Sequence, residues 1–446
     1  MVDAERRPGE PGPAGDAAAG PDLVVEDYVW VLDPSEPMLG PVAPGSTVRF
    51  RTPPGCWGSM LTPDHASGHE VTRPLRIEGA SPGDAVVLRI ESIRVLSAAT
   101  VSGTHAIDPA HHAGDPGVAA KCPGCGLVNP NTALTGDDPP SVVCRRCGSP
   151  VRPYRFAQGY TMAFDDARRV GVTVHGDGVA RIRRDAEARL ALPAGSRQYA
   201  VTRFAMDSPW CVSAPVEPMI GNVGTLPPMS VPSSRNAGDL AWRLAELSGP
   251  HAMDPSCFEQ LTDGHMDINE VREGSVLVAP VRVEGAGVYV GDVHAMQGDG
   301  ELADHTTDVA AEVTLRIDLI EDVGLPGPIV LARPEDLPRV LRPLTDHERS
   351  ASESLARSMG VRIERGRHPL EMVGTGRDVN RATDNAIERL AALTGWDVDE
   401  VRNRATITGG VRIGRLPGVV AVGVLLPTEL ARSLGLLEVL QGHYGG

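Results

Sequence analysis

Polar and apolar side chains alternate along several short stretches of the chain, which is the pattern of half-buried β-strands. The alternation is clearest in residues 46–52 and 85–95. Between them, residues 78–84 read Glu-Gly-Ala-Ser-Pro-Gly-Asp and predict a tight turn that leads into the second strand. Similar patterning predicts further strands at residues 168–174, 179–182, 198–204, 275–283 and 314–320.

Helical periodicity is confined to a few segments. Residues 239–247 predict a short helix that begins after an aspartate in the N-cap position. Near the C-terminus, residues 384–393 place three aliphatic side chains on one stripe, and residues 397–404 predict a second helix. Together these patterns predict an α+β, mainly β fold, in which a two-sheet β-sandwich core is followed by C-terminal helices.

Composition supports a turn-rich chain. Of 446 residues, 50 are Gly and 39 are Pro, while aromatic residues make up only 4%. This composition disfavours long coiled coils and helical bundles, because Gly and Pro interrupt helices. No P-loop or dinucleotide-binding fingerprint occurs.

Charge and hydropathy limit the kinds of ligand and partner that the protein can bind. The formal net charge of −16 disfavours a general nucleic-acid binder, since neutralising phosphates needs a basic surface, and it suits a small neutral or cationic ligand. The sequence contains no run of about 18 apolar residues, the length needed to span a membrane. Residues 1–21 lack the apolar segment of a signal peptide, so we expect a disordered tail on a cytoplasmic protein.

Four of the seven cysteines form two C-x2-C pairs, Cys122 with Cys125 and Cys144 with Cys147. Four thiolates at this separation, flanked by glycines, predict a tetrahedral structural zinc site. A rubredoxin-type iron site and four unrelated thiols are the alternatives. With every position filled by cysteine, the site would stabilise a zinc ribbon and leave no open position for chemistry.

The cysteines lie in a stretch where strand patterning gives way to His, Asp, Gly and Pro, which indicates an insertion. We therefore expect five regions along the chain. They are a disordered tail (1–21), an N-terminal β region (22–102), the zinc-ribbon insertion (103–155), a β-rich catalytic core (156–346) and a C-terminal helical/β region (347–446).

A second cluster of chemistry-bearing residues follows an apolar strand. Residues 290–301 contain Asp292, His294, Asp299 and Glu301 among glycines that let a loop bend closely around a ligand. Carboxylates and imidazole are suitable ligands for Zn, Mn, Ca or Mg. A solvated turn with capping aspartates is the alternative interpretation.

Upstream, His265 and Asp267 are spaced so that they would share one face of a strand. They are candidates to complete the same site.

These segments resemble the acetamidase/formamidase family of amidohydrolases. The loop 291–301 is similar to the most characteristic segment of that family, and residues 73–84, 221–224, 264–267 and 384–427 resemble other family segments in the same order. The resemblance covers nearly all of residues 22–430 outside the cysteine insertion.

Departures from the family pattern indicate a changed pocket. His265 stands where the family generally has Asn, and Asp308 where a Glu often follows the main loop. Residues 54–60 lack the carboxylate and glutamine of the corresponding early loop, and residues 233–262 read as a further insertion.

The resemblance implies hydrolysis of a small linear carboxamide, such as formamide or acetamide, by a homo-oligomeric enzyme. Such chemistry needs a nucleophile, a stabilised oxyanion and an acid, which a divalent metal, zinc or another, and a carboxylate can supply together. The candidate ligands of this second metal are His265, Asp267, Asp292, His294 and Asp299, and the candidate catalytic residues are Glu301, His294 and Asp299. A thiol nucleophile, Cys211 or Cys56, is the competing scheme.

Two other classes of function compete with an amidohydrolase. One is a catalytically idle relative that binds a ligand or partner through the zinc ribbon. The other is a zinc-ribbon nucleic-acid module fused to a sandwich. An idle descendant would have no physical need for the ligand-type side chains of Asp292, His294, Asp299 and Glu301, so their presence favours the enzyme.

Overall fold

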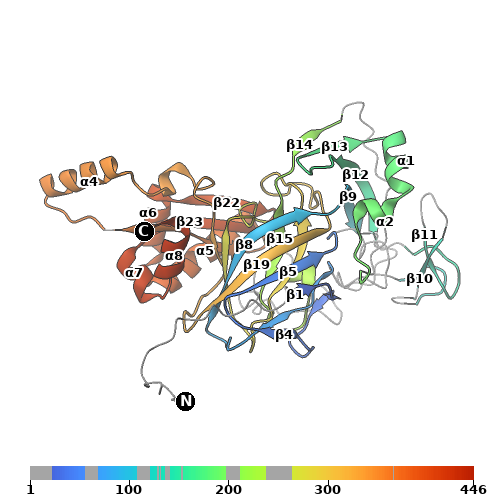
Figure 1. The fold of residues 1–446 in the computed structure, drawn as a ribbon, viewed down its shortest axis with the longest axis horizontal. Coiled ribbons are helices and arrows are strands. Elements are labelled where there is room, and N and C mark those ends of the chain that lie inside the picture. The colour runs from blue at the N-terminus through green and yellow to red at the C-terminus, as the bar shows by residue number, and fades with distance from the viewer. Residues whose placement is uncertain are drawn as a thin grey trace, which may run out of the picture.

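A computed structural model describes most of the chain. The described residues are 23–55, 69–107, 121–127, 130, 132–135, 141–151, 154–196, 211–237, 264–364 and 366–445. Strands dominate, and helices gather at the C-terminal end (Figure 1). None of the described helices combines the length and the apolar content needed to cross a bilayer.

A nine-stranded sheet forms the centre of the molecule. All its neighbouring strands are antiparallel except the first two, which are parallel. In spatial order the strands are β1 (Leu23–Val25), β5 (Ser46–Thr52), β19 (Ala311–Ile320), β8 (Ala85–Val95), β17 (Val276–Pro280), β20 (Ile329–Leu331), β21 (Arg367–Thr375), β23 (Val419–Pro427) and β22 (Gly410–Arg415).

The two faces of this sheet carry different hydrophobic cores. In β8, Val86 and Leu88 belong to one buried cluster, whereas Ala85 and Val87 belong to another. Successive side chains of a strand point to opposite faces, so a strand that lies between two cores needs apolar residues on both faces. Strands β17 and β20 are accordingly apolar and buried throughout, and β8 is so in its first four residues.

A four-stranded sheet shares the first of these cores. Its order is β15 (Met219–Gly224), β18 (Tyr289–His294), β6 (Val71–Thr72) and β2 (Tyr28–Val29). Ile220, Val223 and Val293 pack in the same cluster as Phe50 and Leu88 of the large sheet. Every residue of β15 and β18 is buried, including the polar ones. Because polar residues are rarely buried, those of these two strands are candidates for a functional site.

A second four-stranded sheet lies at the opposite end of the molecule from the C-terminal helices, with the ribbon beyond it (Figure 1). It contains β14 (Ser213–Pro215), β13 (Val170–Val174), β12 (Tyr154–Phe164) and β9 (Ala99–Ile107). Helices α1 (Asp177–Arg183) and α2 (Ala186–Leu190) come between β13 and β14 in the chain. The ribbon hairpin is β10 (Thr132–Thr135) with β11 (Ser141–Cys144). Two further strand pairs are β3 (Val31–Leu32) with β16 (Val231–Pro232), and β4 (Leu39–Val42) with β7 (Leu75–Ile77).

The C-terminal helices cover the second face of the large sheet. Helix α5 (Val379–Thr394) turns Ala386, Leu390 and other apolar residues toward β21 and β23, and its Asp378 N-cap accepts a hydrogen bond from Arg381. The remaining helices are α4 (Asp346–Ser358), which extends away from the body (Figure 1), α6 (Val398–Thr408), α7 (Thr428–Ser433) and α8 (Leu437–Tyr444).

The structure confirms a mainly β, α+β fold with C-terminal helices, and the strands expected at 46–52 and 85–95 have those bounds. The strand expected at 179–182 is wrong, because these residues belong to helix α1. Its buried positions, Gly178 and Ile182, are four residues apart, which is a helical and not a strand spacing. The tail and the elements expected at 198–204 and 239–247 lie outside the described residues.

Candidate active site

Buried polar side chains from separate segments meet beside the four-stranded sheet. Asp292 and His294 belong to β18. Backbone pairing brings in two neighbouring segments, His265 opposite Asn222 of β15 and Asp308 opposite His294. The complete cluster is buried and consists of His69, His265, Asp267, Asp292, His294 and Asp308.

The distances within the cluster are those of ligands around a common centre. The Nε2 atom of His294 lies 3.4 Å from an oxygen of Asp292 and 3.4 Å from an oxygen of Asp308. It lies 4.0 Å from Asp267 Oδ1. Asp267, Asp292 and His294 can thus offer one ligand atom each to a metal ion.

Several of these atoms lack a hydrogen-bond partner. Among the described residues, Asp267 Oδ1, Asp292 Oδ1, His294 Nε2 and Asp308 Oδ1 are all buried without one. Leaving such atoms unsatisfied costs about 1–3 kcal/mol each, and more for charged groups. Convergent orphaned carboxylate oxygens and an imidazole nitrogen fit a divalent cation.

Hydrogen bonds orient the two histidines toward this centre. The Nδ1 atom of His294 lies 2.8 Å from the side-chain oxygen of Gln297, and Nδ1 of His265 lies 2.8 Å from the carbonyl of Ser234. An oxygen acceptor on Nδ1 places the proton there and leaves Nε2 as a lone pair. Gln297 is itself held, because its amide donates to the carbonyl of Asp267 at 2.6 Å.

Two glycines keep the space around the carboxylates open. A Cβ atom on Gly55 would overlap Asp292 Oδ1, and one on Gly221 would overlap Asp267 Oδ1. No larger residue fits at either position without moving a ligand-type oxygen. We call these two glycines the cradle of the site; they lie far apart in the sequence.

Electrostatics show how strongly the cluster is coupled. Burial alone would raise the pKa of Asp292, yet His69 and His294 hold it well below its usual value. Burial would likewise lower the pKa of His294, but Asp292 and Asp308 raise it well above the ordinary range. Positive charge close to the buried carboxylates therefore stabilises their ionised form, and a metal cation would provide such charge.

Arg415 and Glu301 border the cluster. Arg415, at the end of β22, is buried, forms an ion pair with Asp267 and donates to the carbonyl of His265 at 3.0 Å. Glu301 is also buried, and burial together with Asp267 raises its pKa well above the usual value. Its backbone has a positive φ of 42°, as do Asp267 (50°) and Asp292 (53°). Left-handed backbone is unfavourable for residues other than glycine and is often found at functional sites.

Comparison with known proteins places this site in a family. The model of the acetamidase/formamidase family matches residues 57–431. The chain belongs to the acetamidase/formamidase family. By family it is an amide hydrolase.

Solved structures of this family have a similar fold. A predicted acetamidase/formamidase from the thermophile Thermoanaerobacter tengcongensis superposes with a TM-score of 0.51 and 16% identity, covering 93% of this chain and 98% of that one. An acetamidase from Bacillus halodurans gives a TM-score of 0.50 and 17% identity, covering 93% and 99%. A search of curated proteins finds no match.

The structure of this family member brings together most residues that the sequence singled out. His265, Asp267, Asp292 and His294 lie in the cluster, and Glu301 borders it. Asp299 does not join them, because it is exposed on the turn and accepts a hydrogen bond from Asn269 instead. Its place is taken by Asp308, which the sequence had indicated only as a departure from the family pattern.

The sequence patterns did not indicate His69, Arg415 or the two glycines Gly55 and Gly221 as parts of the site. His69 stands in a stretch without strand alternation, where Asp64, His65 and Glu70 are ligand-type residues as well, so the sequence does not single it out. The candidate thiol Cys211 is exposed, unlike the buried cluster. Cys56 lies outside the described residues.

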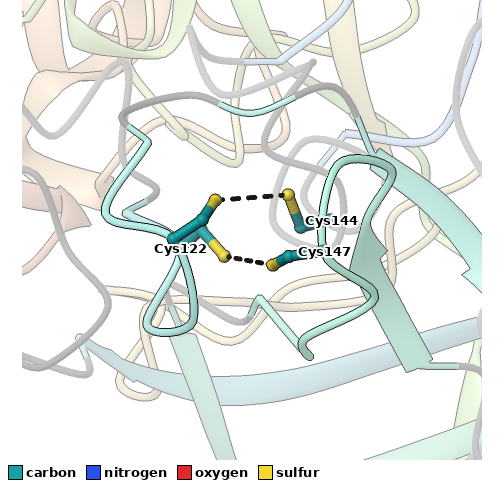
Figure 2. Close-up of side chains that lie close together, drawn as sticks. Cys122, Cys144 and Cys147 are labelled. Atoms are coloured by element: carbon teal, nitrogen blue, oxygen red, sulfur yellow. Dashed lines mark hydrogen bonds between the residues drawn. The ribbon is translucent and has the colours of Figure 1, made fainter.

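The four cysteines of the insertion form a separate site (Figure 2). Their sulfurs are 3.4 Å apart between Cys122 and Cys147, and 3.9 Å apart between Cys125 and Cys144. Tetrahedral Zn–S bonds of about 2.3 Å imply sulfur separations of about 3.8 Å. This part of the family member can therefore hold a metal ion.

The two cysteine knuckles have matching backbones. Gly126 and Gly148, each four residues after the first cysteine of its pair, donate backbone hydrogen bonds to Cys122 and Cys144 at 2.9 and 2.8 Å. Both glycines have a positive φ, 71° and 73°. Hydrogen bonds from Ser149 lower the pKa of Cys147 to about 6, which favours the thiolate that a metal needs.

Proposed function

We propose that this protein cleaves the C–N bond of a small linear carboxamide, of the formamide or acetamide kind, with the help of a divalent metal. The observation that carries the proposal is the convergence of Asp267, Asp292, His294 and Asp308, whose inward-facing atoms are buried and lack hydrogen-bond partners among the described residues. The sequence-expected ligand His265 lies at the same cluster, whereas Asp299 is not retained in this role.

Hydrolysis of the amide consumes one water molecule. Water adds to the carbonyl carbon, its protons pass to the departing nitrogen, the C–N bond breaks, and the products are a carboxylate and an ammonium ion. A bound divalent metal would lower the pKa of water and polarise the carbonyl oxygen. The ligand side chains hold their positions through Gln297, Arg415 and the carbonyl of Ser234.

Glu301 is the proposed proton carrier. Its buried carboxylate interacts electrostatically with Asp267 and His294, so it belongs to the same reaction space. A carboxylate there can accept a proton from water and deliver it to the departing nitrogen. Burial keeps competing bulk water away from this proton.

The test is ammonia release from formamide, acetamide and larger carboxamides. Purified protein should hydrolyse at least one of them, lose the activity after dialysis against a strong chelator, and regain it with Zn²⁺, Mn²⁺ or Co²⁺. Activity that survives complete removal of metal from the histidine–carboxylate cluster would contradict the metal-assisted proposal. An absence of ammonia release from every amide would favour a catalytically idle relative.

We further propose that the cysteine site holds structural zinc. In Cys144→Ser protein, about one zinc per chain should be lost, and the ribbon should become susceptible to limited proteolysis, because three thiolates hold the ion less well. Ammonia release should be retained. Metal analysis by mass spectrometry is the measurement. The assignment would be contradicted if the unmutated protein carried no zinc besides the ions of the histidine–carboxylate cluster.

Assembly remains a prediction from the family resemblance, and we propose a homodimer or larger homo-oligomer. We also propose a cytoplasmic location.

A further inference from the structure

We infer that the site takes a second divalent cation, held by His69, His265 and Asp292 on the far side of the Asp292 carboxylate. This inference rests on the proposed function, since it adds a second ion beside the first. The three residues can offer one ligand atom each to a common ion.

The separations of these three ligand atoms are appropriate for a transition metal. Asp292 Oδ2 lies 3.3 Å from Nδ1 of His69 and 3.1 Å from Nε2 of His265. Two ligands at about 2.1 Å from a tetrahedral zinc are about 3.4 Å apart. The two imidazole rings meet edge to face, with centroids 5.0 Å apart, so that both can address one ion without stacking.

Asp292 divides its two oxygens between two sets of ligands. Oδ2 lies next to His69 and His265, whereas Oδ1 lies next to His294. A carboxylate that turns each oxygen to a different group of ligands is able to bridge two metal ions. Its positive φ of 53° is the backbone conformation that holds it between the two sets.

The balance of charge also favours two cations. The carboxyl groups of Asp267, Asp292, Asp308 and Glu301 are all buried in one place, and Arg415 forms an ion pair with Asp267. A buried carboxylate without a counter-charge costs several kcal/mol. When all four are ionised, one divalent ion and Arg415 supply three positive charges against four negative ones, and a second divalent ion would more than offset the remaining negative charge.

The chemistry of the donors indicates the class of ion. Two imidazole nitrogens and a carboxylate oxygen suit borderline ions such as Zn²⁺ and Co²⁺ best, and the harder Mn²⁺ can bind through the carboxylates of the cluster. His265 already directs its Nδ1 to the carbonyl of Ser234 at 2.8 Å, which frees Nε2 for the metal. Calcium and magnesium prefer oxygen ligands and are less well matched.

Metal counting on the complete chain is the experiment. After reconstitution with Zn²⁺ and gel filtration, unmutated protein should carry about three ions per chain, of which about two belong to this cluster. His69→Ala should lose about one ion and keep the ribbon zinc, and His69→Asp should restore part of the binding because a ligand-type side chain returns. His368→Ala is the matched control, a buried histidine of β21 whose Nε2 lies 3.0 Å from Thr428 Oγ1, and it should lose none.

A second measurement already gives a result on the unmutated protein, before any variant is compared. Chain reconstituted with Mn²⁺ should give the exchange-coupled electron paramagnetic resonance signal of two ions about 3.5–4 Å apart, and His69→Ala should give the signal of an isolated ion. A single uncoupled ion in the unmutated protein, unaffected by His69→Ala but lost in His294→Asn, would overturn the second site and leave the proposed function intact. A cluster that binds no ion at all would overturn both.

Discussion

His294→Asn should reduce turnover of the best amide substrate by at least about 10³-fold in kcat/KM, which corresponds to about 4 kcal/mol of transition-state stabilisation. The imidazole Nε2 faces Asp267, Asp292 and Asp308, and an asparagine amide cannot present a nitrogen lone pair to a cation at that point. The ribbon zinc and the fold should remain, since the cysteines lie in a separate site. Ammonia release, metal content and melting temperature are the three measurements.

His368→Asn is the matched control for that experiment. His368 is a buried histidine as well, but it contacts Thr428 at the C-terminal end of the sheet. Its replacement should change stability without abolishing ammonia release. If His294→Asn kept near-normal turnover, the metal-centred assignment would be wrong, and a thiol nucleophile such as Cys211 would have to be considered.

Part of the fold could be predicted because some strands in this protein bury alternate residues. Segment 46–52 does so, whereas segment 85–95 alternates only in its second half and is buried throughout its first four residues; both are strands of the central sheet. Where alternation and helical spacing coincide over few residues, the pattern is ambiguous. Residues 179–182 show this. They belong to a helix whose buried residues, Gly178 and Ile182, are four positions apart.

The site was predictable where its residues are neighbours in sequence. Asp292 and His294 alternate within one strand and therefore point to the same face. Asp299 was misplaced for the converse reason, because Gly298 and Gly300 turn the chain and expose it, with φ of 85° at Gly300. Sequence proximity alone did not guarantee a shared direction.

Residues supplied by distant segments could not be found from periodicity. His69 reaches Asp292 because strand β6, which follows it, pairs with β18 through Val71 and Gly291. Arg415 arrives from β22, more than a hundred residues further along the chain. Such contacts depend on the order of strands in space, which alternation does not encode.

The role of the cradle can be tested by adding a single methyl group. In Gly55→Ala, the new Cβ would occupy the position of Asp292 Oδ1 and would lie 3.0 Å from Asp308 Oδ1. The backbone of Gly55 does not have a positive φ, so alanine causes no backbone strain there. Asp292 is buried and cannot swing into solvent, and the methyl group must therefore displace a ligand oxygen from the cluster.

We expect Gly55→Ala to lose the metal ions of the cluster and to reduce kcat/KM by about 10²–10³-fold, or about 3–4 kcal/mol, while overpacking lowers the free energy of unfolding by about 1–3 kcal/mol. Gly298→Ala is the matched control, because its Cβ would meet nothing within 4 Å and it lies on the turn that exposes Asp299. It should leave metal content and turnover near normal. Metal analysis and ammonia release measured on the two variants decide the question, since equal metal content in both would mean that the space beside Asp292 is not where a cation binds.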